Sequence, residues 1–226
     1  MNVWNLIVRF FQGGGEFMYP IAIVLVAGLA IAIERYVYLS RVAAKNRDLW
    51  NEIVPMLSQG NFARVIQVTS KSDSAIGQIL NYGLARVQSA RRRDDIEKAM
   101  EESLMEVVPK LEKRTHYLAT FANLATLLGL LGTVMGLINA FSAVATVNPA
   151  EKASLLSASI SVAMNCTAFG LMTAVPILFI HAWLQTKTTE LIDSLEMVSV
   201  KFLNAVTERR AESAGAAAAT AAVAAA

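Results

Sequence analysis

Three long apolar stretches divide the chain, and each is long enough to cross a bilayer as a helix. The first is uncharged from Phe17 to Ile33, and the second has no Asp, Glu, Lys or Arg from Thr115 to Ala150. The third stays free of these residues from Ala153 to Thr186, about 51 Å of helix at 1.5 Å per residue. The hydrocarbon core is only about 30 Å thick, and a helix satisfies its own backbone there. We therefore predict three spans, the second and third projecting beyond the bilayer.

The region between the first two spans also has a helical pattern. It holds 13 Lys or Arg and 10 Asp or Glu between residues 40 and 114. We expect helices at Val42 to Leu57, Phe62 to Thr69 and Ala75 to Arg91, with a turn at Ser58 to Asn61. A long amphipathic helix begins at Asp94, and we expect it to run unbroken into the second span because Pro109 can kink a helix without ending it. The predicted fold is an all-α integral membrane protein with three transmembrane helices, the second and third very long and extending into the cytoplasm.

These patterns divide the chain into eight predicted segments. They are an N-terminal interfacial helix at 1–15, a first span at 16–39, a cytoplasmic helical domain at 40–114, a second span at 115–147, a periplasmic loop at 148–152, a third span at 153–186, a cytoplasmic C-terminal helix at 187–210 and an Ala-rich tail at 211–226. The orientation follows from the basic residues near the ends of the spans. Arg41, Lys45, Arg47, Lys110, Lys113, Arg114, Lys187 and Lys201 gather on one side, against Arg9 and Lys152 on the other. The positive-inside rule then places the N-terminus outside.

Polar and small residues recur inside the second and third spans, where a lipid-facing anchor has no use for them. In the second span they are Asn123, Thr126, Gly129, Gly132, Thr133, Gly136, Asn139 and Ser142. In the third, Ser154, Ser157, Ser161 and Asn165 share one face, while Ser159, Thr167 and Thr173 form another with Gly170 between them. Glycines let helices approach closely, and two polar faces indicate both a neighbouring helix and a lumen. The alternative is that each hydroxyl only bonds a carbonyl of its own helix.

Composition narrows the chemistry further. The net charge of +2 gives no sign of nucleic-acid binding. One cysteine, Cys166, and two separated histidines, His116 and His181, offer no metal cluster, and no nucleophile–base set or cofactor motif indicates an enzyme. Neither the second nor the third span contains a carboxylate, and threonine hydroxyls do not titrate near neutral pH. If the protein conducts ions, the titrating acid must come from another chain.

Two motifs resemble those of the MotA/TolQ/ExbB proton-channel family. The stretch Gly129 to Leu137 (GLLGTVMGL), followed by Phe141, resembles the family's second-span signature. The stretch Cys166 to Pro176 (CTAFGLMTAVP) resembles its third-span pattern, in which Thr precedes A-x-G-L and Pro follows. With three predicted spans, the chain resembles the ExbB/TolQ branch more than flagellar MotA, which has four spans.

The resemblance implies an inner-membrane homopentamer whose second and third helices line a pore. The pore would enclose the helices of an ExbD/TolR-like single-span partner that supplies a membrane Asp, and work would pass to a TonB- or TolA-like protein. Thr133 and Thr167 match the family's pore-lining threonines, and Asn165, Ser161, Thr126 and Asn139 are further candidates along the ion pathway. Gly129, Gly132, Gly136, Gly170 and Pro176 are expected to pack helices.

The chain also departs from the family pattern. The acid that precedes the third-span Thr by five positions is Val162 here, the usual Pro before the second-span motif is Thr126, and the usual Trp is Met135. These departures leave the coupling ion open between proton and sodium. Two other functions stay open: a membrane scaffold without ion conduction, and a motility stator of the same family.

Overall fold

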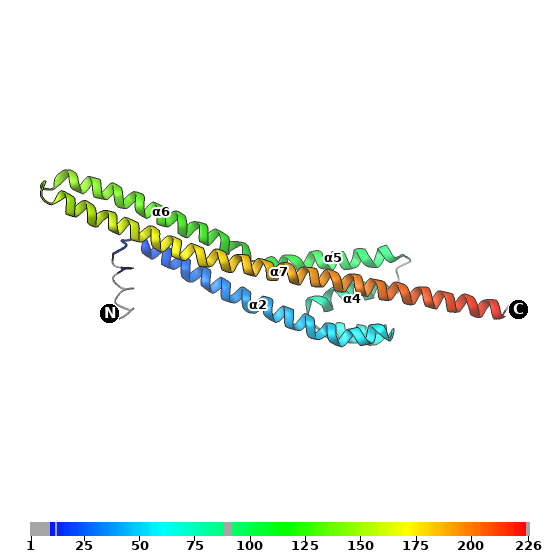
Figure 1. Cartoon of the computed structure of the whole chain (residues 1–226). Coiled ribbons are helices and arrows are strands. Elements are labelled where there is room, and N and C mark those ends of the chain that lie inside the picture. Colours follow the sequence, from blue (N-terminus) through cyan, green and yellow to red (C-terminus); the bar gives the residue numbers. More distant parts are fainter. Residues whose placement is uncertain (1–9, 12, 88–91, 225–226) are drawn as a thin grey trace. The chain divides into compact units, whose positions relative to one another are not determined.

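The computed structural model describes residues 10–11, 13–87 and 92–224, and all regular structure in these ranges is helical. The helices are α2 (Met18–Ser58), α3 (Phe62–Thr69), α4 (Ala75–Val87), α5 (Arg93–Glu112), α6 (Thr115–Thr146) and α7 (Lys152–Ala224), shown in Figure 1. Three helical stretches are long and apolar enough to cross a membrane. The predicted all-α class with three spans is therefore confirmed. Most of the predicted interfacial helix, in residues 1–9 and 12, lies outside the described residues.

The helices predicted at Phe62 to Thr69 and from Ala75 are confirmed as α3 and α4, while residues 88–91, at the predicted end of the latter, lie outside the described residues. The helix predicted at Val42 to Leu57 is the second part of α2. One expectation is wrong. We expected the helix that begins near Asp94 to run unbroken into the second span, but α5 ends at Glu112 and α6 begins at Thr115. Arg114 has a left-handed backbone with φ of 68°, a conformation that costs a non-glycine residue about 1–2 kcal/mol. Its guanidinium forms an ion pair with Glu34 at 3.2 Å. The sequence gives no sign of this break because left-handed helix ends usually carry Gly or Asn.

The chain forms two compact units, and the break falls at their boundary. The first unit consists of Met1–Tyr36 and Arg114–Gln185, so it holds the apolar parts of α2, α6 and α7. The second consists of Val37–Lys113 and Thr186–Ala226. Both α2 and α7 contribute to each unit, which explains why these two helices are so long.

Close contact between α6 and α7 organises the first unit, and Figure 1 shows the two helices side by side. A Cβ added at Gly170 would lie 2.7 Å from the carbonyl oxygen of Ala125 and 3.0 Å from the Cα of Gly129. Further along, a Cβ at Gly136 would lie 2.7 Å from the Cβ of Ala163. Helix α2 also packs against α7. A Cβ added at Gly28 of α2 would lie 2.9 Å from the side chain of Ile177 on α7. At Gly170 the neighbouring atoms belong to the backbone of α6, so no larger side chain fits without moving the helices apart.

The outside of the first unit is strongly apolar. Phe179 is 76% exposed, Ile23 70% and Leu127 61%. At most 33% of the residues in any of the three apolar windows are buried within the chain. Such a surface needs lipid or other protein chains around it, since soluble monomers do not expose large contiguous apolar areas.

The second unit is a helical bundle with its own core. Phe202 of α7 is fully buried, and a Cβ at Gly83 of α4 would lie 3.2 Å from its ring and 2.8 Å from Met100 of α5. The region 40–114 therefore does not form its core alone. The C-terminal helix supplies part of it, including Leu195, Val198 and Val206, which sequence analysis did not foresee.

We expect Gly170→Ala to weaken the α6–α7 contact. The new Cβ meets backbone atoms, which cannot rotate away, so overpacking should cost about 1–3 kcal/mol of stability. Gly215→Ala is the matched control, because it lies in the same helix with nothing within 4 Å of the added Cβ. Apparent melting temperatures of the detergent-solubilised proteins should fall for the first variant and stay level or rise for the second. Equal melting temperatures would contradict the close packing.

Candidate functional site

A hydrogen bond between the second and third apolar helices joins the two motifs found in the sequence. The hydroxyl of Thr167 on α7 donates to the carbonyl oxygen of Gly129 on α6 over 2.8 Å. Gly129 permits this approach, since a Cβ there would lie 3.3 Å from the Cα of Thr167. The same carbonyl is the helical acceptor for the N–H of Thr133, four residues later. Thr133 and Thr167 are therefore joined through one carbonyl group.

Both hydroxyl groups of this threonine pair act as hydrogen-bond donors to backbone carbonyls. Thr133 donates its hydroxyl hydrogen to the carbonyl oxygen of Leu130 over 2.6 Å, and Thr167 donates to Gly129. Both side chains are partly exposed. A hydroxyl that has used its hydrogen still has lone pairs to offer. The pair thus presents two acceptor oxygens, which suit a cation or the O–H of a protonated acid.

The other predicted pathway residues of α6 lie away from this pair. The hydroxyl of Thr126 donates to Ala122 over 3.1 Å, within its own helix. Asn139 is exposed near the other end of α6. Among the packing residues, Gly132 lies against buried Cys166, whereas Pro176 is exposed and lies next to Ile177, which contacts Gly28.

On α7, Asn165 makes a contact that sequence analysis did not anticipate. Its amide nitrogen donates to the carbonyl oxygen of Gly13 over 3.2 Å, although the two residues are 152 positions apart. Nearby, the ring of Phe169 contacts that of Phe11, with centroids 5.1 Å apart. Val162, which stands where the related motif has an acid, lies beside Gly15, since a Cβ on that glycine would be 3.3 Å away. Ser161 remains exposed.

Two polar side chains of the first unit are buried, one of them Thr173 from the second polar face of the third span. Thr173 is 1% exposed, and its hydroxyl has no hydrogen-bond partner in the described part of the chain. The other is Arg35, which follows the first uncharged stretch and is 3% exposed. Hydropathy alone cannot tell which side of a helix is covered, so the burial of these two groups needed a structure.

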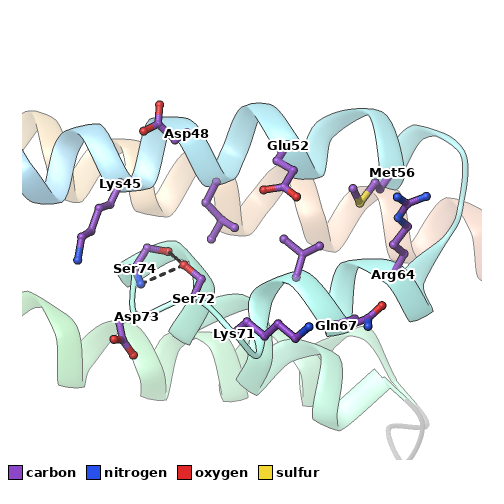
Figure 2. A pocket seen from close by; sticks show the side chains of 12 residues that line it. Lys45, Asp48, Glu52, Met56, Arg64, Gln67, Lys71, Ser72, Asp73 and Ser74 are labelled. Carbon is purple, nitrogen blue, oxygen red and sulfur yellow. Dashed lines mark hydrogen bonds between the residues drawn. The ribbon is translucent and has the colours of Figure 1, made fainter.

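The second unit contains a polar hollow of about 720 Å³, shown in Figure 2. It lies between α2, α3 and the loop before α4, where Ser72 donates to Ser74 over 3.0 Å. Its charged lining is balanced, with Lys45, Arg64 and Lys71 against Asp48, Glu52 and Asp73. Balanced charge gives this hollow no preference for a ligand of one sign.

Comparison with known proteins gives one family. Residues 71–197 match the model of the MotA/TolQ/ExbB proton channel family, a match that includes both motifs and the threonine pair. It spans more than half of the chain.

Individual relatives agree with this family. An ExbB homolog from Methanothermobacter thermautotrophicus is 23% identical over 200 residues, which cover 88% of this chain and 70% of that protein. An ExbB-like protein from Synechocystis is 24% identical over 165 residues, 73% of this chain and 78% of the relative. The Tol-Pal system protein TolQ from Pseudomonas aeruginosa is 31% identical over 113 residues, 46% of this chain and 48% of TolQ.

We expect Asn165→Ala to loosen the segment that begins at Gly13. Loss of one hydrogen bond worth about 1 kcal/mol should speed local opening about fivefold. Hydrogen exchange measured by mass spectrometry in nanodiscs should show faster exchange over residues 13–19. Ser161→Ala, one turn away and exposed, serves as the control and should leave that exchange unchanged. Identical exchange in both variants would show that the Asn165 contact does not hold the segment.

Proposed function

Because the chain belongs to the MotA/TolQ/ExbB proton channel family, we propose that it is the ExbB/TolQ-like subunit of an ion-driven motor in a bacterial inner membrane. The observation that carries this proposal is the pair formed by Thr133 and Thr167, one threonine from each family motif. The hydroxyl of Thr167 donates to the carbonyl of Gly129, and that of Thr133 donates to the next carbonyl along α6, that of Leu130. The pair offers oxygen ligands, while α6 and α7 carry no carboxylate at membrane depth.

Since the second and third spans contain no carboxylate, we infer that a partner protein supplies one. A path for protons through the bilayer needs a group that titrates, and hydroxyls do not. We assign that role to the membrane Asp of an ExbD/TolR-like single-span protein, held in a pore lined by α6 and α7. Several copies of this chain are needed to enclose such a pore, and the unburied apolar surface of the first unit supports an assembly. We propose a homopentamer with its N-terminus periplasmic and its C-terminus cytoplasmic.

The direction of the hydrogen bonds made by the threonine pair suggests how protonation of the partner's Asp is coupled to its movement. Both hydroxyls already donate to backbone carbonyls, so they present lone pairs to the pore. A protonated Asp can donate to these oxygens, but an ionised Asp only accepts and finds no donor unless a hydroxyl rotates and gives up its bond. The pair therefore stabilises the protonated acid, and loss of the proton drives the partner's helix to a new position. Sodium would bind the same oxygens directly.

The available energy fits work on the envelope. Each charge that crosses releases about 2.3 kcal/mol per 100 mV. Several ions per mechanical step would therefore be needed to move a partner that passes force to a TonB- or TolA-like protein. Such force would serve TonB-dependent import or Tol-type maintenance of the envelope.

We expect Thr133→Ala and Thr167→Val each to reduce ion flux through the reconstituted complex. A hydrogen bond between neutral groups contributes about 0.5–1.5 kcal/mol, so the loss of one from a protonated acid should lower flux about twofold to tenfold. Thr167→Ser keeps the oxygen and should retain flux. Flux is measured in liposomes with a pH-sensitive or sodium-sensitive dye under an imposed potential.

Thr120→Val is the matched control for this experiment. Thr120 is exposed on the same α6 and bonds only the carbonyl of His116, outside both motifs. Its replacement should leave flux and assembly unchanged. Wild-type flux in both Thr133→Ala and Thr167→Val, with the complex intact, would overturn the proposed role of the pair and favour a scaffold without ion conduction.

A further inference from the structure

The second unit contains another hollow. Unlike those of the hollow in Figure 2, its charged lining residues are mostly basic. It encloses about 240 Å³ between α2, the start of α4 and α5. Its charged lining consists of Arg41, Lys45 and Lys110, against Asp73 alone. At about 30 Å³ per water, it has room for about eight water molecules, more than a phosphate group requires.

The positive charge of this hollow is largely uncompensated. The side chains of Arg41 and Lys45 make no hydrogen bond or ion pair with any other residue that the structure describes. Lys110 forms an ion pair with Glu106 at 2.9 Å, but both side chains are more than half exposed, so this pair is weak. Even with Glu106 included, three cations face two acids.

The start of α4 adds to the positive field without supplying free donors. The N–H of Ile76 donates to the side chain of Asn46 over 3.3 Å, and that of Gly77 donates to Ser74 over 3.0 Å. The helix dipole still favours an anion near this end. Direct recognition, however, has to come from the side chains of Arg41, Lys45 and Lys110.

The position of these side chains in the chain connects them to the membrane. Arg41 follows Ile33, the last residue of the first uncharged stretch, by about two helical turns, and Lys110 precedes Thr115 by little more than one turn. Tyr38, which also lines the hollow, belongs to a residue type enriched at membrane interfaces. The lining residues thus come from where the chain leaves and re-enters the apolar phase, beside the layer of lipid headgroups.

We propose that this hollow binds the phosphate of an anionic phospholipid headgroup, with Arg41 and Lys45 as its main ligands and Lys110 as a third. Bound lipid would join α2, α4 and α5 at the membrane surface. The proposal requires the chain to lie in a membrane, but it does not depend on ion conduction, so the two proposals can fail separately.

The test uses the full chain, purified in mild detergent with its co-purifying partners. Thermal stability is titrated with phosphatidylglycerol, with phosphatidylcholine and with inorganic phosphate. The test variant is Arg41→Gln with Lys45→Gln. The control is Arg47→Gln with Lys98→Gln, which removes the same charge from exposed positions outside the hollow.

Phosphatidylglycerol should raise the melting temperature of the wild type and the control more than phosphatidylcholine does. At about fivefold in affinity per basic residue, the test variant should bind it about twenty-fivefold more weakly. If inorganic phosphate stabilises the wild type as strongly as phosphatidylglycerol does, the ligand is a soluble phosphate and the lipid assignment is wrong. Equal affinity for phosphatidylglycerol in test variant and control would overturn the site. Should the double variant lose its fold in the absence of lipid, Arg41→Gln alone against Arg47→Gln decides, with a fivefold difference expected.

Discussion

The close approach of α6 to α7 is the constraint on which the candidate site depends. Gly129 and Gly170 face each other with no side chain between them, so the hydroxyl of one helix reaches a backbone carbonyl of the other. A methyl group at Gly170 would lie 2.7 Å from the carbonyl oxygen of Ala125, so the two backbones would have to move apart. The small residues therefore do more than pack helices, because they set the position of Thr167 relative to Thr133. The close packing at Gly129 and Gly170 therefore also sets the geometry of the proposed ion-binding oxygens.

Much of this arrangement could be predicted from the sequence, because a bilayer leaves few options. Long uncharged stretches must be helical, and the caps and turns around Phe62 to Thr69 follow from local chemistry. The break at Lys113 and Arg114 could not be predicted, because it depends on a left-handed arginine that pairs with Glu34 far away in sequence. The bond from Asn165 to Gly13 was missed for the same reason, since no periodicity relates residues so distant.

The residues Thr133 and Thr167 were identified from motifs, but the direction of their hydrogen bonds needed a structure. A sequence shows that two hydroxyls are present, and not whether their hydrogens are already used. The second unit shows the same limit. The sequence predicts a helical domain at 40–114, whereas Phe202 of α7 also contributes to its core. In both cases a contact between distant segments decides what a local pattern means.

The central claim is that this chain builds a pore around a partner that carries the titrating acid. Native mass spectrometry of the complex, extracted from its own membrane in mild detergent, tests that claim most directly. We expect a homopentamer of the 24.4 kDa chain together with a small single-span protein that has an Asp within its span. A monomer or dimer without such a companion would contradict it.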